Sequence, residues 1–258
     1  MTKTLISAAA FTLLAMGSAT AADMFKMPPP APGYDWTGFY LGPHLGGYWN
    51  TVDWFEDSTT TGSFLVGPVG FHDASVKTSG VFGGGQGGWN YQTGWFVWGI
   101  EADGSAGALS GSSPCYSETA ALGFAQRCST KISALGTFTA RIGAAFGNTL
   151  WYLEGGGAWE DEKLVDACNV CGPGGSPTSA VYSQGIGGLT FGAGIEYAFA
   201  GKWSAFLQYN YVAFGTRDLT FLYQPPNVPL AGNYTEDIRE NTNIIKFGIN
   251  YRFGGPYW

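Results

Sequence analysis

The sequence predicts an all-β fold, an eight-stranded antiparallel up-and-down transmembrane β-barrel with four long external loops and short periplasmic turns. Only 12% of the residues are charged, while 16% are aromatic and 41 are glycine; an average soluble domain has about 25% charged residues. Eight segments alternate bulky apolar with small or polar residues, which indicates β-strands. Long and short connections alternate strictly between these segments, as is typical of membrane barrels. No apolar run approaches the roughly 18 residues of a membrane helix.

The N-terminal segment has the features of a secretory signal peptide. Lys3 is followed by an apolar stretch, Leu5–Met16, and by the small-residue cleavage site Ala19–Ala21. An uncleaved anchor is disfavoured because this stretch is too short to span a membrane. We expect residues 1–21 to be removed and residues 22–35, which are rich in proline, to form an extended periplasmic linker.

The clearest strands form a hairpin from Gly188 to Gly215. In its first arm, large apolar or small residues alternate with polar or small ones from Leu189 to Phe199. Each arm has about 11 residues, the length of a tilted transmembrane strand. The bulky face would overfill an eight-stranded barrel, so we expect it to face lipid. The predicted strands are Phe39–Trp49, Val81–Gln92, Trp95–Asp103, Ile132–Phe146, Leu150–Trp159, Gly188–Phe199, Trp203–Gly215 and Asn243–Phe253.

Short turns and long polar stretches connect these strands. Pro43 lies in the first predicted strand, where a proline is tolerated only at a position whose backbone N–H would not donate a hydrogen bond to the neighbouring strand. The barrel is expected to extend over residues 36–253, followed by a short tail at 254–258, with both termini in the periplasm. The predicted turns are Thr93–Gly94, Gly147–Asn148 and Ala200–Lys202, and the predicted loops are residues 50–77, 104–130, 160–187 and 216–242.

Aromatic residues gather near the strand ends, as in the interfacial girdles of membrane barrels. The alternative fold is a secreted lipocalin-type barrel of eight strands with the two faces reversed. Its outer face would be mostly glycine, with too few charges for solubility, so the membrane barrel is preferred. The expected girdle residues are Trp36, Trp95, Trp151, Trp203, Tyr251 and Phe253 near the turns, and Trp49, Trp159 and Phe214 near the loops.

Charged residues at inward positions predict a polar network inside the barrel. An open pore would use such charges to select ions. The interior of an eight-stranded barrel is about filled by side chains, so paired charges in a closed lumen are the preferred interpretation, with Glu154 the first candidate partner of Arg141. The network residues are Glu101, Asp103, Arg141, Glu154, Glu196, Lys246 and Arg252.

Several segments resemble the small outer-membrane β-barrel surface proteins of alpha-proteobacteria, the porin-family or outer-membrane immunogenic protein type. The resemblance implies an eight-stranded barrel that supports envelope integrity and host contact, and some members are reported to bind haem. It also implies that the barrel assembly machinery reads the last strand, through Phe247, Ile249, Tyr251 and Phe253. Here residues 254–258 follow Phe253, so Phe253 and Trp258 are both candidate signals. The matching segments are Asp35–Tyr40, Gly84–Gln86, Trp89–Gln92, Gly99–Asp103, Gly192–Phe199 and Gly248–Phe253.

The four cysteines fit an oxidising compartment. Cys115 and Cys128 share one predicted loop, and Cys168 and Cys171 share another, so a local disulfide in each loop is the preferred interpretation. A redox pair at Cys168 and Cys171, or a zinc site of all four, is the alternative. No βαβ pattern or second C-x-x-C supports it.

No motif predicts an enzyme, a cofactor or a metal site. The G-x-G-x-x-G at 83–88 lies inside a strand with no helix after it, so a dinucleotide site is not expected. His44 and His72 could ligate haem or a metal, but two histidines on separate elements are more often incidental. The acidic residues of the predicted loops form either a solvated surface or a cation bridge to lipid phosphates. A net charge of −7 without a basic patch argues against nucleic acid.

We therefore expect a structural barrel of the cell outer membrane that supports envelope integrity and displays surface loops, in contact with outer-membrane lipid and lipopolysaccharide. One alternative is a narrow diffusion pore for small solutes. Another is loop-mediated binding of a ligand such as haem, or of a host surface. The oligomeric state is left open.

Overall fold

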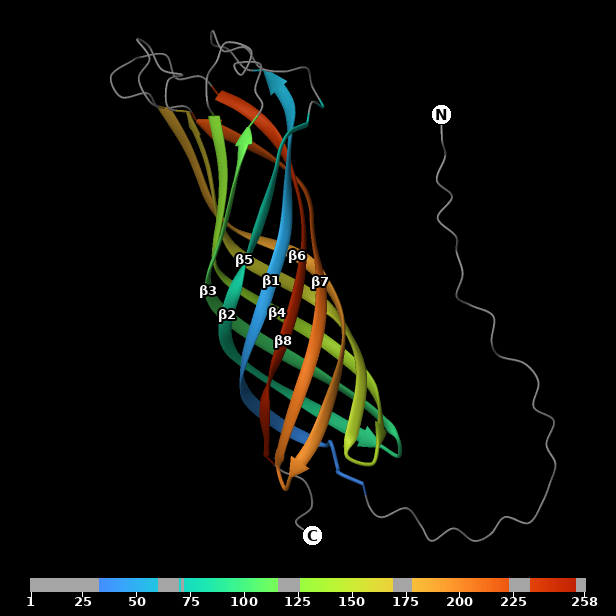
Figure 1. The fold of residues 1–258 in the computed structure, drawn as a ribbon. Helices are drawn as coiled ribbons and strands as arrows, with labels where there is room; N and C mark the ends of the chain where they lie inside the picture. Colours follow the sequence, from blue (N-terminus) through green and yellow to red (C-terminus); the bar gives the residue numbers. More distant parts are fainter. Residues whose placement is uncertain are drawn as a thin grey trace, which may run out of the picture. The chain divides into compact units, whose positions relative to one another are not determined.

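The computed structural model contains a closed antiparallel barrel of eight strands (Figure 1). It describes residues 33–59, 70, 72–115, 126–168, 178–222 and 233–253. Consecutive strands pair with one another, and β1 also pairs with β8, which closes the ring. Within this part of the chain, no helix is long and apolar enough to cross a membrane. The strands are β1 (Gly38–Thr59), β2 (His72–Thr93), β3 (Phe96–Cys115), β4 (Gln126–Phe146), β5 (Thr149–Cys168), β6 (Thr178–Ala200), β7 (Trp203–Leu222) and β8 (Asn233–Phe253).

Two-residue turns join the strands at one end of the barrel, which we call the turn end; the opposite end is the loop end. The turns are Gly94–Trp95, Gly147–Asn148 and Gly201–Lys202. Their glycines have φ values of 60°, 59° and 53°, a left-handed conformation that glycine adopts without a steric penalty. The three predicted turns are confirmed to within one residue.

The strands continue far beyond the boundaries that the sequence pattern predicts. β1 and β2 remain paired from Asn50 and Thr78 up to Phe55 and His72, within the stretch predicted as a loop. The predicted loop boundaries at 50–77, 104–130, 160–187 and 216–242 are therefore wrong, because each stretch begins and ends as strand. The reason is that the pattern inverts: toward the loop end the apolar side chains point into the barrel, as Val52, Trp54, Val76, Leu164 and Ile238 do, each 0% exposed.

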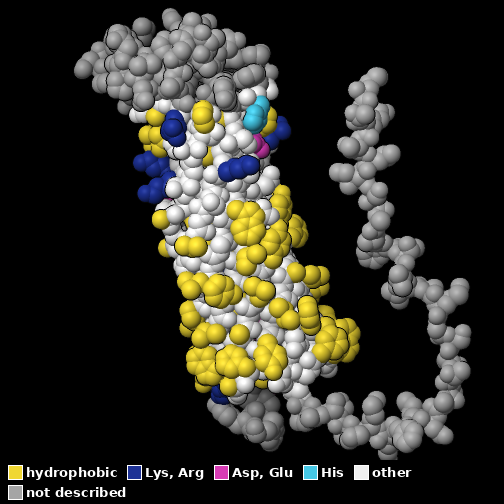
Figure 2. All heavy atoms as spheres, in the orientation of Figure 1, with side chains coloured by type: hydrophobic (Ala, Val, Ile, Leu, Met, Phe, Trp, Pro, Cys, Tyr) yellow, Lys and Arg dark blue, Asp and Glu magenta, His cyan; other side chains and the backbone are white. Residues whose placement is uncertain are grey.

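The lower part of the barrel carries an apolar belt on its outer face (Figure 2). The predicted outward residues are exposed in this belt, among them Phe39, Phe138, Trp151 and Phe247. Trp49 and Trp159 mark its edge toward the loop end. Beyond this edge the exposed side chains include Lys and Arg (Figure 2). This distribution matches a membrane-spanning zone that ends well below the loop end of the strands.

Two of the predicted girdle residues lie inside the barrel instead. Trp36 is 0% exposed and packs in the lumen at the turn end, where the Arg252 guanidinium lies 5.2 Å from its ring. Phe214 is also buried, because its position on β7 has the inward parity that it shares with Val212. The prediction that both face the membrane interface was wrong.

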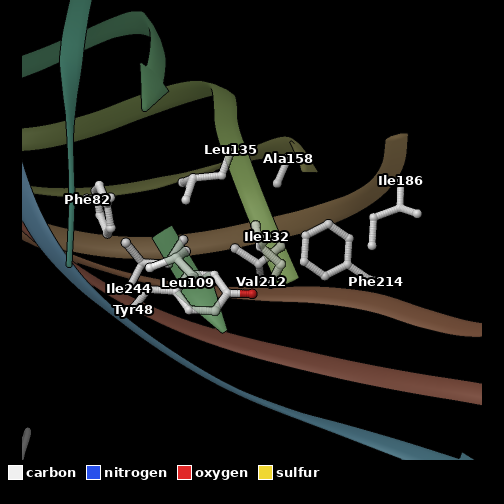
Figure 3. Packing of buried hydrophobic residues seen from close by; sticks show 10 residues of the cluster. All are labelled: Tyr48, Phe82, Leu109, Ile132, Leu135, Ala158, Ile186, Val212, Phe214 and Ile244. Carbon is white, nitrogen blue, oxygen red and sulfur yellow. The ribbon is translucent and has the colours of Figure 1, made fainter. Parts of the chain in front are cut away.

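Three apolar clusters follow one another along the lumen. The turn-end cluster comprises Trp36, Val97, Leu150, Tyr152 and Ala198. The loop-end cluster comprises Val52, Trp54, Ala74, Val76, Cys128, Leu164, Leu219 and Ile238. Between them lies the central plug, which comprises Tyr48, Phe82, Leu109, Ile132, Leu135, Ala158, Ile186, Val212, Phe214 and Ile244 (Figure 3).

Candidate functional site

The seven charged residues predicted to face the lumen are all buried there, and we call them the charged layer. The alternation of each strand brings them inward, and the ring closure brings β3, β4, β5, β6 and β8 around one axis. The layer occupies the part of the lumen between the turn-end cluster and the central plug. Its members are Glu101, Asp103, Arg141, Glu154, Glu196, Lys246 and Arg252, none of them more than 8% exposed.

Arg141 is the centre of this layer. Its Nη2 forms a very close ion pair with Oε2 of Glu101. Its guanidinium also lies 3.9 Å from Glu154 and 3.8 Å from Glu196. The rings of Tyr152 and Tyr40 flank it at 4.4 Å and 5.2 Å. One buried cation therefore faces three carboxylates from three other strands.

The neighbouring carboxylates have further donors. The Tyr40 hydroxyl donates to Glu101 at 2.8 Å. The amides of Gln208 and Asn210 donate to Oε1 of Glu154 at 2.6 Å and 2.5 Å. These donors offset part of the cost of burying the carboxylates away from water.

Two further cations complete the layer. Lys246 Nζ lies 2.8 Å from Oδ2 of Asp103, which also accepts a hydrogen bond from Thr137. Arg252 donates to the backbone oxygen of Trp36 at 2.5 Å and lies 3.6 Å from Glu196. Arg252 thus ties the charged layer to the turn-end cluster.

Inward glycines make room for the tyrosine side chains that flank Arg141 in the charged layer. A Cβ on Gly88 would overlap the Tyr40 hydroxyl and the backbone oxygen of Ile100. A Cβ on Gly194 would overlap the ring of Tyr152. The G-x-G-x-x-G at 83–88 lies within β2, where Gly88 faces the lumen and Gly83 and Gly85 lie on the outer face.

The central plug was missed by sequence reasoning. Leu109 and Ile186 fall in stretches predicted as loops, and Phe214 was assigned to the aromatic girdle although its parity places it on the polar face of its strand. The available signal was the parity of β7, where Phe206, Val212 and Phe214 interrupt an otherwise polar face. All three are buried in the lumen. Figure 3 shows the plug side chains pointing toward one another from several strands.

A second group of charges lies beyond the plug, on the loop-end side of Trp49 and Trp159 and so outside the apolar belt. Carboxylate oxygens of Glu160, Glu162 and Glu240 lie within 4.8 Å of one another, and we call these residues the upper carboxylate cluster. All three are buried, although they fall in stretches predicted as loops, whose acidic residues were expected to form a solvated surface or a cation bridge to lipid phosphates. This placement was wrong because β5 and β8 continue as barrel strands there.

Electrostatics in this cluster disfavour three negative charges. Burial, followed by the charge of Glu240, raises the pKa of Glu162 to about 8, although Arg217 opposes the shift. Burial likewise raises the pKa of Glu240. Arg217 donates to Glu162 at 3.2 Å and to Glu240 at 2.6 Å. The cluster is the one group of acidic side chains in the described residues with metal-ligand geometry.

The two histidines lie in different surroundings. His44 is buried, with Nε2 2.6 Å from Ser105 Oγ and Nδ1 3.0 Å from Gln86 Oε1. His72 has an exposed side chain 3.5 Å from Asp53. Both ring nitrogens of His44 are thus engaged within the protein, which disfavours the suggested role as a ligand.

The residues of the predicted assembly signal lie on β8. Phe247, Ile249 and Phe253 of β8 are exposed on the apolar belt, and Tyr251 is half-buried beside them. Residues 254–258 lie outside the described part.

Cys128 is buried in the loop-end cluster. The side chains of Cys115 and Cys168, and all of Cys171, lie outside the described residues, so the disulfides stay a prediction.

Two relatives from Brucella are similar to this chain over most of its length. The 31 kDa outer-membrane immunogenic protein of Brucella melitensis is 29% identical over 254 residues, which cover 92% of this chain and 94% of that protein. The 25 kDa outer-membrane immunogenic protein of Brucella abortus is 26% identical over 262 residues, which cover 97% of this chain and 98% of that protein.

Two solved outer-membrane proteins are similar at low sequence identity. The outer membrane protease OmpT of Escherichia coli has a TM-score of 0.48 and 8% identity, covering 84% of this chain and 97% of that chain. The outer membrane protein OprG of Pseudomonas aeruginosa has a TM-score of 0.48 and 13% identity, and the match covers 86% of this chain and 99% of that chain. The sequence profile described as "Outer membrane protein beta-barrel domain" matches residues 9–253. The chain belongs to this outer-membrane β-barrel family, and its place is the cell outer membrane.

Proposed function

We propose that the protein is a closed structural barrel, which stabilises the outer membrane and neither conducts solutes nor catalyses a reaction. The observation that carries the proposal is the central plug, ten apolar or aromatic side chains packed across the lumen. A hydrated ion that enters from the loop end would meet the central plug before it reached any residue of the charged layer. Apolar constrictions of this kind exclude water and ions by dewetting.

The charged layer supports the same conclusion. Arg141 contacts Glu101, Glu154 and Glu196, and Lys246 contacts Asp103. Breaking one partner of a buried ion pair typically costs about 3–5 kcal/mol. These charges therefore hold the strands together rather than line an open path.

Catalysis is disfavoured by the surroundings of the one buried histidine. His44 contacts Ser105, but its other ring nitrogen contacts the amide of Gln86 and not a carboxylate. A nucleophilic serine needs a base that a third group orients, with access for substrate. His44 and Ser105 are both buried in the lumen.

The outer face supports contact with lipopolysaccharide. Beyond the apolar belt, Lys and Arg side chains are exposed on the outer face (Figure 2), while the carboxylates of Glu160, Glu162 and Glu240 are buried. Exposed cations at this level can pair with phosphate groups of the outer leaflet. The exposed basic residues are Lys77, Arg127, Lys131, Lys163 and Arg239.

Single-channel recording in planar bilayers tests the closed lumen. We expect the purified protein to give no steady conductance. A Phe82→Ala, Phe214→Ala variant should give one, because it removes two rings from the plug. Phe138→Ala is the matched control, since Phe138 lies on the outer face and is 61% exposed. Steady conductance steps from the unmodified protein would overturn the proposal.

A further inference from the structure

The upper carboxylate cluster joins strands that are not neighbours in the barrel. Glu160 and Glu162 belong to β5, and Glu240 belongs to β8. Their carboxylates meet across the lumen, and none of them is more than 3% exposed. Strand pairing alone does not bring these groups together, because β5 pairs with β4 and β6.

The charges of the cluster do not balance. Arg217 is the only basic side chain of the described residues that forms an ion pair with these glutamates. Glu160 has no basic partner in this part of the chain; its Oε2 accepts a hydrogen bond from the Tyr48 hydroxyl at 3.2 Å. Three carboxylates and one guanidinium leave a net charge of −2 when all are ionised, a state that the cluster disfavours on its own and that a bound cation would stabilise. One divalent cation would neutralise that charge.

An independent observation also points to a missing ligand. The amide of Asn50 is buried against the cluster, with Nδ2 donating to Glu240 and, at 2.7 Å, to the Tyr48 hydroxyl. Among the residues that the structure describes, none donates a hydrogen bond to its Oδ1, to Oε1 of Glu160 or to Oε1 of Glu162. A buried acceptor without a partner costs free energy, so the unpartnered oxygens of Asn50, Glu160 and Glu162 leave room for a ligand that this contact group would hold.

We propose that the upper carboxylate cluster binds one calcium-type divalent cation, held by Glu160, Glu162 and Glu240, with the Asn50 amide oxygen as a further ligand. Hard cations prefer oxygen ligands, and carboxylates can bind in one- or two-oxygen mode. Ca²⁺ accepts irregular sets of oxygens, whereas Mg²⁺ demands near-octahedral geometry and keeps several waters. A buried group of carboxylates therefore suits Ca²⁺ better.

The bound ion would connect β5 to β8 above the central plug. It would stabilise the extended part of the barrel, which lies outside the apolar belt and receives no support from lipid. Binding is independent of whether the lumen conducts, so the proposal stands apart from the closed-barrel function.

Refolding from denaturant into detergent with CaCl₂ or with EDTA tests the site. We expect one bound calcium per chain after desalting, by elemental analysis, and a higher midpoint of thermal unfolding with CaCl₂ than with EDTA. Glu160→Gln should weaken calcium binding about tenfold or more, because it removes a charged ligand at nearly constant size. Asp161→Asn is the matched control, since Asp161 lies on the same strand but faces outward.

Terbium luminescence gives a readout that does not depend on stability. Tb³⁺ in the cluster should be sensitised by Tyr48, and CaCl₂ should quench the signal by competition. Substoichiometric calcium in the unmodified protein, with equal unfolding midpoints in CaCl₂ and EDTA, would overturn the proposal. Equal losses of Tb³⁺ luminescence in Glu160→Gln and Asp161→Asn would overturn it as well.

Discussion

Arg141 on β4 makes its closest ionic contact with Glu101 on β3, and not with Glu154, its direct partner across the β4–β5 ladder. Glu154 is held by the amides of Gln208 and Asn210. Glu101 accepts from both Tyr40 and Arg141. The sequence-based choice of Glu154 as the first partner considered inward parity on neighbouring strands alone, whereas the competing hydrogen bonds decide which carboxylate the guanidinium approaches.

Double-mutant cycles should reproduce this ranking. Arg141→Met is expected to lower the free energy of unfolding by about 3–5 kcal/mol, because it leaves buried carboxylates without their cation. The coupling energy with Glu101→Gln should be about 2 kcal/mol, and the coupling with Glu154→Gln about 1 kcal/mol or less. Urea unfolding in detergent, followed by tryptophan fluorescence, measures both. Equal couplings would contradict the geometry.

Much of the fold could be predicted because the membrane imposes a sharp contrast between the two faces of each strand. Phe39, Leu41 and Leu45 on β1 face outward while Tyr40 and His44 face inward, as parity requires. Beyond the belt the contrast disappears. There Lys163 faces water and Leu164 faces the lumen. Without bulky apolar residues on the outer face, the sequence of this stretch resembles that of a polar loop.

The candidate site was predictable only in part. An isolated charge such as Lys246 at an inward position is visible in the sequence, and burial requires a partner for it. The partner itself depends on which strands lie across the lumen, as Asp103 of β3 does for Lys246 of β8. The upper carboxylate cluster has the same origin, because Glu160 and Glu240 are 80 residues apart and meet only in the closed barrel.

The strand extensions should contribute to stability. Trp54 is 0% exposed in the loop-end cluster, so Trp54→Ala should lower the free energy of unfolding by about 3–5 kcal/mol. Trp95 is 65% exposed, so Trp95→Ala should cost about 1 kcal/mol or less. Urea unfolding in detergent compares the two. A Trp54→Ala effect as small as that of Trp95→Ala would mean that this region behaves as a loop.

The packing of Tyr40 should depend on the absence of a side chain at Gly88. Gly88→Ala places a methyl group against the Tyr40 hydroxyl and the Ile100 backbone, which should destabilise the barrel by about 1–3 kcal/mol. Gly104→Ala is the control, because a Cβ there meets nothing within 4 Å. Thermal unfolding in detergent distinguishes the variants. No difference between them would show that the lumen adapts freely at this position.

Lipopolysaccharide binding should depend on the outward lysines. A Lys131→Gln, Lys163→Gln variant should bind less well to vesicles that contain lipopolysaccharide, with a loss of about 1 kcal/mol per lysine at low salt. Lys202→Gln at the turn end should leave binding unchanged. Vesicle flotation at low and high salt measures the effect, since added salt should reduce the difference. Undiminished binding of the double variant would exclude this surface as the contact.

The last strand should carry the assembly signal in its own aromatic residues. β8 closes the barrel against β1, and Phe247, Ile249 and Phe253 are exposed on its outer face. A protein truncated after Phe253 keeps this pattern complete, so we expect deletion of residues 254–258 to leave insertion unchanged. Phe253→Ala should reduce insertion, because it removes the last outward ring of the strand. Heat-modifiable migration on gels, with outer-membrane fractions from cells, measures folded and inserted protein. Complete loss of insertion in the truncated chain, with normal insertion of Phe253→Ala, would instead assign the signal to Trp258.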